Sequence, residues 1–261
     1  MNTLFANSPD SVQIAYDCSG TGGPAIVLVH GGGSNRQDWH DAGYVSRLQE
    51  DFAVITLDLR GHGESDLPTD PADYTTDKIG RDILTVADAC GVERFIIWGM
   101  SYGGKVSRYL AAQSERVAKL ILMGTPMGPS VSGEIRQEIE GFCAHWPPII
   151  QAQSDGTLDI GALSQDDREF LLNFNVPVIM AWGRAMLDWP TIKPADFRCP
   201  TLWLAGSEDQ PAMASVREFE QSLKGSRVQL HIVEGLNHEQ VFERIDKVFA
   251  TMLAFTQNAP K

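Results

Sequence analysis

Short apolar runs alternate with segments of helical periodicity along most of this chain. Five almost continuous apolar runs predict strands that are buried on both faces: residues 25–29, 53–57, 95–98, 120–123 and 201–204. Residues 228–232 alternate between apolar and polar and predict a half-exposed edge strand, and residues 12–16 predict an early strand. Apolar residues at helical spacing predict helices over 79–90, 216–223 and 241–253. The alternation predicts an α/β fold with a mostly parallel central sheet flanked by helices.

The alternation of strands and helices stops between residues 127 and 194. Helical stretches follow one another there, at 133–144, 165–174 and 178–187, without a strand-like run between them. Helix-breaking dipeptides interrupt this region at Pro147-Pro148, Asp155-Gly156 and Trp189-Pro190. We therefore expect residues 127–194 to form an inserted helical cap, or lid. Residues 1–126 and 195–261 are expected to form the core.

Charge and composition narrow the classes of partner. The 261 residues carry a net charge of −13, which argues against nucleic acid or an anionic membrane surface as partner. The chain shows no signal-peptide pattern and no apolar run of membrane-spanning length, so a cytoplasmic location is expected. The four cysteines have no C-x-x-C spacing and are interpreted as small buried hydrophobic residues. The oligomeric state stays open.

A candidate nucleophile lies where the strand at 95–98 meets helix-like sequence. Residues 99–103 read Gly-Met-Ser-Tyr-Gly, which fits the pattern G-x-S-x-G. In the strand, turn and helix context this pattern is typical of a sharp turn that exposes the serine oxygen. The glycines at 99 and 103 remove side chains that would collide across such a turn. Ser101 is therefore predicted to be a nucleophile.

A serine hydroxyl needs a base within hydrogen-bond reach, and the base needs an anion beside it. The strand at 201–204 leads into Glu208 and Asp209, and the edge strand leads into His238. Both loops follow the carboxyl ends of strands, where α/β sheets gather their functional residues. We predict His238 as the base and Asp209 as the acid, with Glu208 as the alternative acid.

The reaction also needs donors for the developing oxyanion. Residues 30–33 read His-Gly-Gly-Gly directly after a buried strand, and the backbone N–H groups of Gly32 and Tyr102 are the predicted donor pair. No cofactor is expected. Residues 20–25 formally fit the dinucleotide fingerprint G-x-G-x-x-A, but a strand follows them instead of a helix. No two histidines have metal-ligand spacing with a carboxylate, so no metal site is predicted.

These motifs together resemble those of the α/β-hydrolase superfamily over essentially the whole chain. Residues 58–65, Asp-Leu-Arg-Gly-His-Gly-Glu-Ser, look like the family's D-x-R-G-x-G-x-S loop. The glycine-rich loop after His30 is similar to its oxyanion loop, and residues 99–103 are similar to its nucleophile elbow. The loops at 206–209 and 235–238 match its acid and histidine loops. The residues after 126 occupy its cap position.

The resemblance implies a serine hydrolase that acts on a carbonyl substrate, and an apolar cap favours neutral, hydrophobic esters or lactones. Trp146 and Trp182 are the cap residues that we expect at the mouth of the pocket. The same triad also supports hydrolysis of carbon–carbon bonds and cofactor-free perhydrolysis. From a different class, a small-molecule receptor with slow turnover remains an alternative. A small-molecule ester or lactone is the expected partner.

Overall fold

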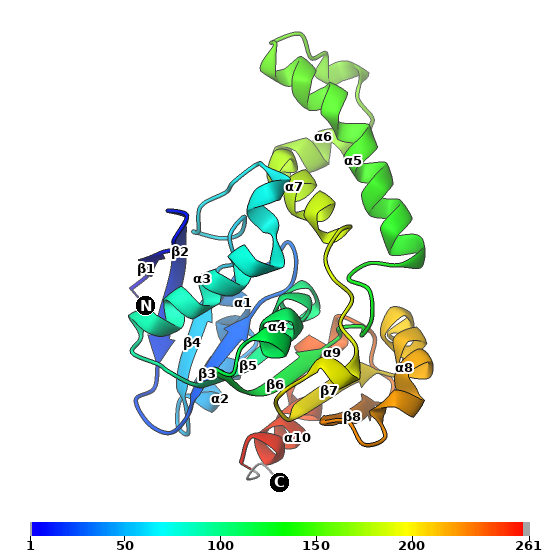
Figure 1. Ribbon diagram of the computed structural model, residues 1–261. Coiled ribbons are helices and arrows are strands. Elements are labelled where there is room, and N and C mark those ends of the chain that lie inside the picture. Colours follow the sequence, from blue (N-terminus) through cyan, green and yellow to red (C-terminus); the bar gives the residue numbers. More distant parts are fainter. Residues whose placement is uncertain (1, 258–261) are drawn as a thin grey trace. The chain divides into compact units, whose positions relative to one another are not determined.

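A mostly parallel eight-stranded sheet forms the centre of the protein, as the sequence predicts (Figure 1). The computed structural model describes residues 2–257. The strands are β1 (Leu4–Asn7), β2 (Gln13–Ser19), β3 (Ala25–Val29), β4 (Ala53–Leu57), β5 (Phe95–Met100), β6 (Val117–Met123), β7 (Thr201–Gly206) and β8 (Val228–Val233). Their order across the sheet is β1-β2-β4-β3-β5-β6-β7-β8. β2 runs antiparallel to both of its neighbours, β1 and β4. The remaining strands, which lie in the order β4-β3-β5-β6-β7-β8, run parallel to one another.

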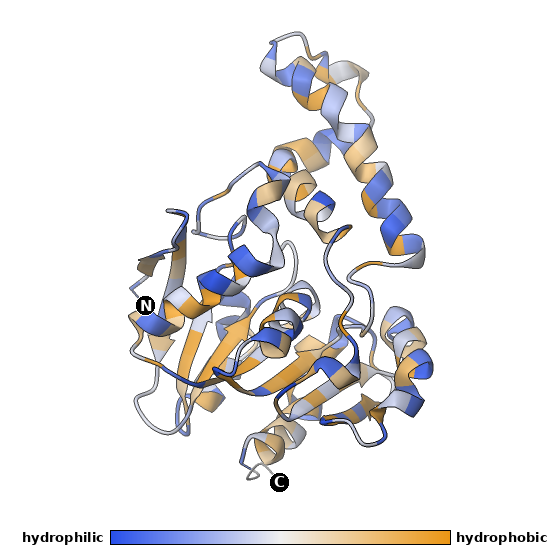
Figure 2. Ribbon diagram, viewed as in Figure 1, coloured by the Kyte–Doolittle hydropathy of each residue, from blue (hydrophilic) through white to orange (hydrophobic). Residues whose placement is uncertain are grey.

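The interior strands are apolar along most of their length (Figure 2). Every residue of β3, β5 and β7 is buried, which explains why these strands read as unbroken apolar runs. β8 lies at one edge of the sheet, as its alternating pattern predicts. β1 at the other edge was not predicted, because three of its four residues are exposed and their pattern carries little signal.

Helices cover both faces of the sheet (Figure 1). Those of the sheet-bearing part are α1 (Gln37–Asp41), α2 (Tyr44–Leu48), α3 (Thr76–Ala89), α4 (Ser101–Gln113), α8 (Gln210–Leu223), α9 (Gln240–Glu243) and α10 (Ile245–Gln257), with the short 3-10 helix η3 (Pro194–Asp196). α2, α9 and α10 contribute to one buried cluster with Ile26, Trp98 and Ile121 of the sheet. α3 and α4 pack on the opposite face. The helix expected over 241–253 is two helices, because the backbone of Arg244 leaves the helical region at φ −88° and ψ 62°.

The described chain divides into two compact units. The first contains the sheet and comprises residues up to Asp66, Thr76–Gly128 and the residues from Thr191 onward. The second comprises Leu67–Thr75 and Pro129–Pro190. Within the first unit, Gly128 and Ile192 form an isolated antiparallel bridge. Segment 67–75 packs with the second unit, whereas the sequence analysis assigned it to the core.

The second unit is helical. It contains α5 (Gly133–Ser154), α6 (Gln165–Asn173), α7 (Val176–Met186) and two short 3-10 helices, η1 (Pro71–Tyr74) and η2 (Ile160–Ala162). α7 packs against η1 and α5, and the indole of Trp189 donates a 2.9 Å hydrogen bond to the carbonyl oxygen of Tyr74. This packing explains why segment 67–75 belongs here.

The expectation that Pro147-Pro148 breaks a helix was wrong, because α5 continues through both prolines. Proline removes a backbone donor and disfavours the preceding turn. Trp146, directly before the two prolines, is buried against the rings of Phe142 and Phe170. This packing stabilises the helical turn that the prolines disfavour. Within residues 2–257, we find no helix with the length and apolar character that a membrane span requires.

Candidate active site

Ser101 lies at the junction of β5 and α4 in a strained backbone conformation. Its φ is +49°, in the left-handed region that residues with a side chain rarely adopt. A side chain at Gly99 would place its Cβ 2.5 Å from the carbonyl oxygen of Gly103. A side chain at Gly103 would collide with the carbonyl oxygens of Val29 and His30. Glycine at both positions therefore permits the turn that exposes the serine.

The structure brings the predicted nucleophile, base and acid together. The hydroxyl oxygen of Ser101 lies 3.0 Å from His238 Nε2, and His238 Nδ1 lies 2.8 Å from Asp209 Oδ2. Ser101, Asp209 and His238 follow β5, β7 and β8, so all three stand at the carboxyl edge of the parallel strands. The arrangement lets the imidazole take a proton from the hydroxyl while the carboxylate fixes its orientation.

The two candidate acids have different surroundings. Asp209 is 2% exposed, and its other oxygen accepts a 3.1 Å hydrogen bond from the backbone N–H of Ala212, which caps α8. Glu208 is exposed to solvent. Only Asp209 of these two contacts His238.

A cavity of about 320 Å³ opens beside Ser101 in the first unit. The residues that line it are His30, Gly31, Gly32, Ser34, Asp38, Met100, Ser101, His238, Glu239, Phe242 and Glu243. Gly32 therefore shares the cavity with the serine, and Tyr102 follows the serine in the first turn of α4. Their role as oxyanion donors stays a prediction.

Buried polar contacts hold the glycine-rich loop against the loop after β4. His30 Nε2 accepts a 3.0 Å hydrogen bond from the backbone N–H of Leu59, and its Nδ1 lies 2.7 Å from the carbonyl oxygen of Gly31. Nε2 is the acceptor, so the proton sits on Nδ1. Burial lowers the pKa of His30 to about 4, which keeps the ring neutral at physiological pH.

Asp58 anchors the same loop at a second point. Its fully buried carboxylate pairs with the guanidinium of Arg36 and accepts hydrogen bonds from the backbone N–H groups of Arg36 at 2.7 Å and Glu64 at 2.8 Å. The motif at 58–65 is recognisable in the sequence, but nothing in the sequence assigns this role to Asp58 or distinguishes Arg36 from other arginines. The two residues are 22 positions apart in the chain, and no periodicity links them. These contacts position the Gly31–Gly32 backbone.

The buried histidines predict a pH-dependent stability. Burial lowers the pKa of His62 to about 3, as it lowers that of His30 to about 4. Below pH about 6.5 the unfolded chain therefore binds protons that the folded chain does not. We expect the free energy of unfolding to fall between pH 6.5 and 4, by at most about 1.4 kcal/mol per pH unit for each histidine. Urea unfolding at several pH values measures this slope.

His62→Gln should make this slope shallower, whatever its effect on stability at neutral pH. His231→Gln is the matched control, because His231 lies on the edge strand β8 and is only partly buried. If the free energy of unfolding of His62→Gln depended on pH as steeply as that of the wild type, buried His62 would not contribute to the pH dependence.

The remaining sequence predictions concern two tryptophans of the second unit, a segment that resembles a dinucleotide-binding motif, and metal sites. Trp146 is 3% exposed and packs within the second unit, and Trp182 of α7 is half-buried. Their place at a pocket mouth stays a prediction. Residues 20–24 connect β2 to β3 with no helix after them, so this segment lacks the helix N-terminus that a dinucleotide site needs. No cluster of three or more potential metal ligands occurs among residues 2–257.

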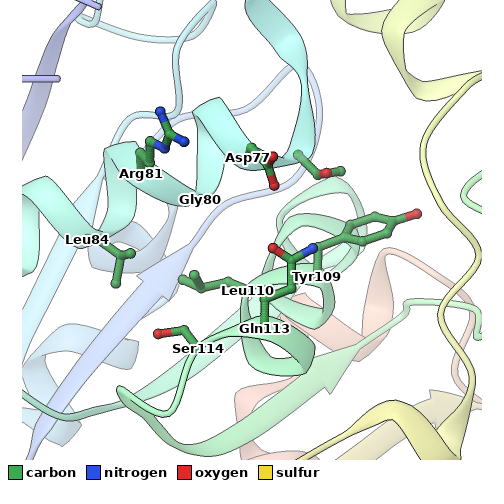
Figure 3. Close-up of a pocket in the computed structure, with 9 residues that line it drawn as sticks. Asp77, Gly80, Arg81, Leu84, Tyr109, Leu110, Gln113 and Ser114 are labelled. Atoms are coloured by element: carbon green, nitrogen blue, oxygen red, sulfur yellow. The ribbon is translucent and has the colours of Figure 1, made fainter. Parts of the chain in front are cut away.

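A second cavity, of about 390 Å³, lies between α3 and α4 (Figure 3). Thr76, Asp77, Tyr109 and Ser114 contribute polar groups to its wall. No histidine is among its lining residues, so a serine–histidine pair like Ser101 and His238 is absent from this cavity. The cavity beside Ser101 is the stronger candidate for chemistry.

The comparisons with known proteins agree with the fold. A family model described as the alpha/beta hydrolase fold matches residues 24–147. An esterase from Thermogutta terrifontis has a similar structure, with a TM-score of 0.75 and 24% sequence identity, and the match covers 98% of both chains. The chain therefore has the α/β-hydrolase fold.

Two curated proteins match this chain over almost its whole length. A Bacillus subtilis protein provisionally named 2-succinyl-6-hydroxy-2,4-cyclohexadiene-1-carboxylate synthase is 25% identical, and the match covers 97% of this chain and 100% of the relative. A non-heme haloperoxidase from Rhodococcus erythropolis is 28% identical, with coverage of 97% and 99%. The relatives carry different names on one fold, so the reaction must be argued from the site.

Proposed function

We propose that the protein is a serine hydrolase that cleaves neutral, hydrophobic carboxylic esters or lactones through an acyl-enzyme on Ser101. The observation that carries the proposal is the pair of hydrogen bonds that links Ser101 to His238 at 3.0 Å and His238 to Asp209 at 2.8 Å. Ser101 and His238 line a cavity that Gly31 and Gly32 also line.

The proposed reaction has two halves. His238 takes the proton of Ser101 while the serine oxygen attacks the carbonyl carbon, and Asp209 stabilises the imidazolium. The backbone N–H groups of Gly32 and Tyr102 donate to the oxyanion, and each such donor is typically worth about 3 kcal/mol. His238 then protonates the departing alcohol. Water repeats the cycle on the acyl-enzyme, which releases the acid and restores the serine.

The charges of the cavity support a neutral substrate. Asp38, Glu239 and Glu243 line it, and no lysine or arginine lines it. An anionic group beside these carboxylates would be repelled. The product in the name of the Bacillus subtilis relative bears a carboxylate, and no lysine or arginine lines this cavity to pair with such an anion.

This charge distribution predicts discrimination between esters of similar size. We expect kcat/KM for p-nitrophenyl hemisuccinate, which is anionic, to be about tenfold lower than for p-nitrophenyl butyrate, which is neutral. Asp38→Asn should narrow the difference, and initial rates on the two esters measure it. Glu234→Gln is the matched control, because Glu234 is exposed and does not line the cavity. Equal kcat/KM values for the two esters would contradict a repulsive cavity.

The experiment that tests the proposed function is a series of initial rates on p-nitrophenyl esters of increasing acyl length. Rapid release that peaks at one chain length supports an esterase and measures its acyl pocket. Absence of release by folded wild-type protein would overturn the ester proposal. It would favour carbon–carbon bond hydrolysis or ligand sensing.

A second candidate activity is perhydrolysis, in which hydrogen peroxide replaces water in the second half of the reaction. The whole-length similarity to a haloperoxidase favours this candidate. Peracid formation from an ester and peroxide, measured beside hydrolysis of the same ester, separates the two activities. A perhydrolase forms peracid faster than it forms acid under these conditions.

A further inference from the structure

Two cysteines that are far apart in the sequence lie in contact in the first unit. Cys18 belongs to β2, and Cys90 directly follows the last residue of α3. Their sulfur atoms are 3.0 Å apart, although the residues are 72 positions apart in the chain. The interpretation of all four cysteines as buried hydrophobic residues holds for Cys143 and Cys199, but Cys18 is exposed and Cys90 is only partly buried.

The two thiols have unequal surroundings. The hydrogen bond between the two sulfur atoms lowers the pKa of Cys18 and raises the pKa of Cys90. The lowered pKa of Cys18 favours a thiolate at this residue. Because the thiolate is the reactive form, the more reactive sulfur is also the exposed one.

We propose that Cys18 and Cys90 form a redox-active thiol pair that hydrogen peroxide converts into a disulfide. Cys18 attacks one peroxide oxygen and becomes a sulfenic acid, and the other oxygen leaves as hydroxide, which a proton converts to water. The sulfur of Cys90 then attacks the Cys18 sulfur and expels the hydroxyl group, which leaves as water with the Cys90 proton. Two thiols lose two electrons in total, and one peroxide gains them.

The geometry requires little movement for this reaction. The sulfur atoms must approach from 3.0 Å to a bond length of about 2.05 Å. The new bond joins β2 to the end of α3 and closes a long loop, which restricts the unfolded chain. Neither cysteine lines the cavity beside Ser101. We expect the disulfide to raise the melting temperature by about 10 °C and to leave ester hydrolysis unchanged.

Thiol counting tests the proposal directly. Purified, reduced protein is treated with hydrogen peroxide, and free thiols are counted in denaturant before and after treatment. The wild type should fall from four thiols to two, because the pair consumes both of its thiols. Mass spectrometry should find the tryptic peptide 82–94 linked to the peptide that contains Cys18. Thermal melts with and without a reductant measure the gain in stability.

Serine variants supply the controls. Cys18→Ser should keep its three remaining thiols, whereas Cys90→Ser should lose only the Cys18 thiol, as a sulfenic acid that finds no partner, and neither variant should show a reductant-dependent melting temperature. Cys199→Ser removes a buried thiol and should still form the bond, falling from three thiols to one. The proposal is overturned if the wild type keeps four thiols, if Cys18→Ser loses thiols as the wild type does, or if the bond joins two chains on a non-reducing gel.

Discussion

Replacing Ser101 with alanine is expected to lower kcat for ester hydrolysis by about a millionfold, to near the residual rate that binding and oxyanion donors supply. The variant lacks the oxygen that forms the acyl bond, and His238 has no hydroxyl proton to take. Substrate binding should change little, because the cavity and its backbone donors remain. Initial rates on the best p-nitrophenyl ester, with wild type and variant at equal concentration, measure the loss.

The variant should fold, because alanine meets the same left-handed backbone at position 101 that serine already tolerates. Ser107→Ala is the matched control. Ser107 lies on the same helix, and its buried hydroxyl donates a 2.7 Å hydrogen bond to the carbonyl oxygen of Gly103. This control can lose about 1 kcal/mol of stability but should keep kcat within about twofold of the wild type. A folded Ser101→Ala protein with wild-type kcat would remove Ser101 from the mechanism.

The parts of the fold that the sequence predicts are those with a local signal. β3 and β5 are buried on both faces, so they read as apolar runs, and Gly99 and Gly103 mark the turn because nothing larger fits. The loops that carry Asp209 and His238 follow recognisable strands. Since carboxyl ends of parallel strands share one edge, their convergence with Ser101 could be expected before the distances were known.

The parts that the sequence does not predict depend on contacts between distant residues. The anchoring of Arg36 by Asp58 and the contact between Cys18 and Cys90 join positions 22 and 72 residues apart, and no pattern within one element encodes them. Tertiary packing also overrides local rules, since α5 continues through two prolines. Segment 67–75 contains two prolines and only one short helix, so its grouping with the helical unit depends on the contacts that α7 makes.

Asp209→Asn is expected to lower kcat by about 10⁴-fold while the protein stays folded. The asparagine amide can donate to His238 Nδ1, which favours the tautomer with its proton on Nε2 and so removes the acceptor for the Ser101 proton. Asparagine also caps helices well, so the hydrogen bond from the Ala212 N–H that starts α8 should survive. Steady-state rates and thermal melts of the purified variant test both statements.

Glu208→Gln is the matched control for the neighbouring carboxylate. The Glu208 side chain is exposed, and its backbone N–H, which donates a 3.0 Å hydrogen bond to the carbonyl oxygen of Leu236, is unchanged by the substitution. Its kcat should therefore stay within about twofold of the wild type. The reverse result, a large loss in Glu208→Gln and none in Asp209→Asn, would make Glu208 the acid. A large loss in Asp209→Asn alone would mean that the buried carboxylate in contact with His238, and not the neighbouring carboxylate of the loop, carries this part of the catalysis.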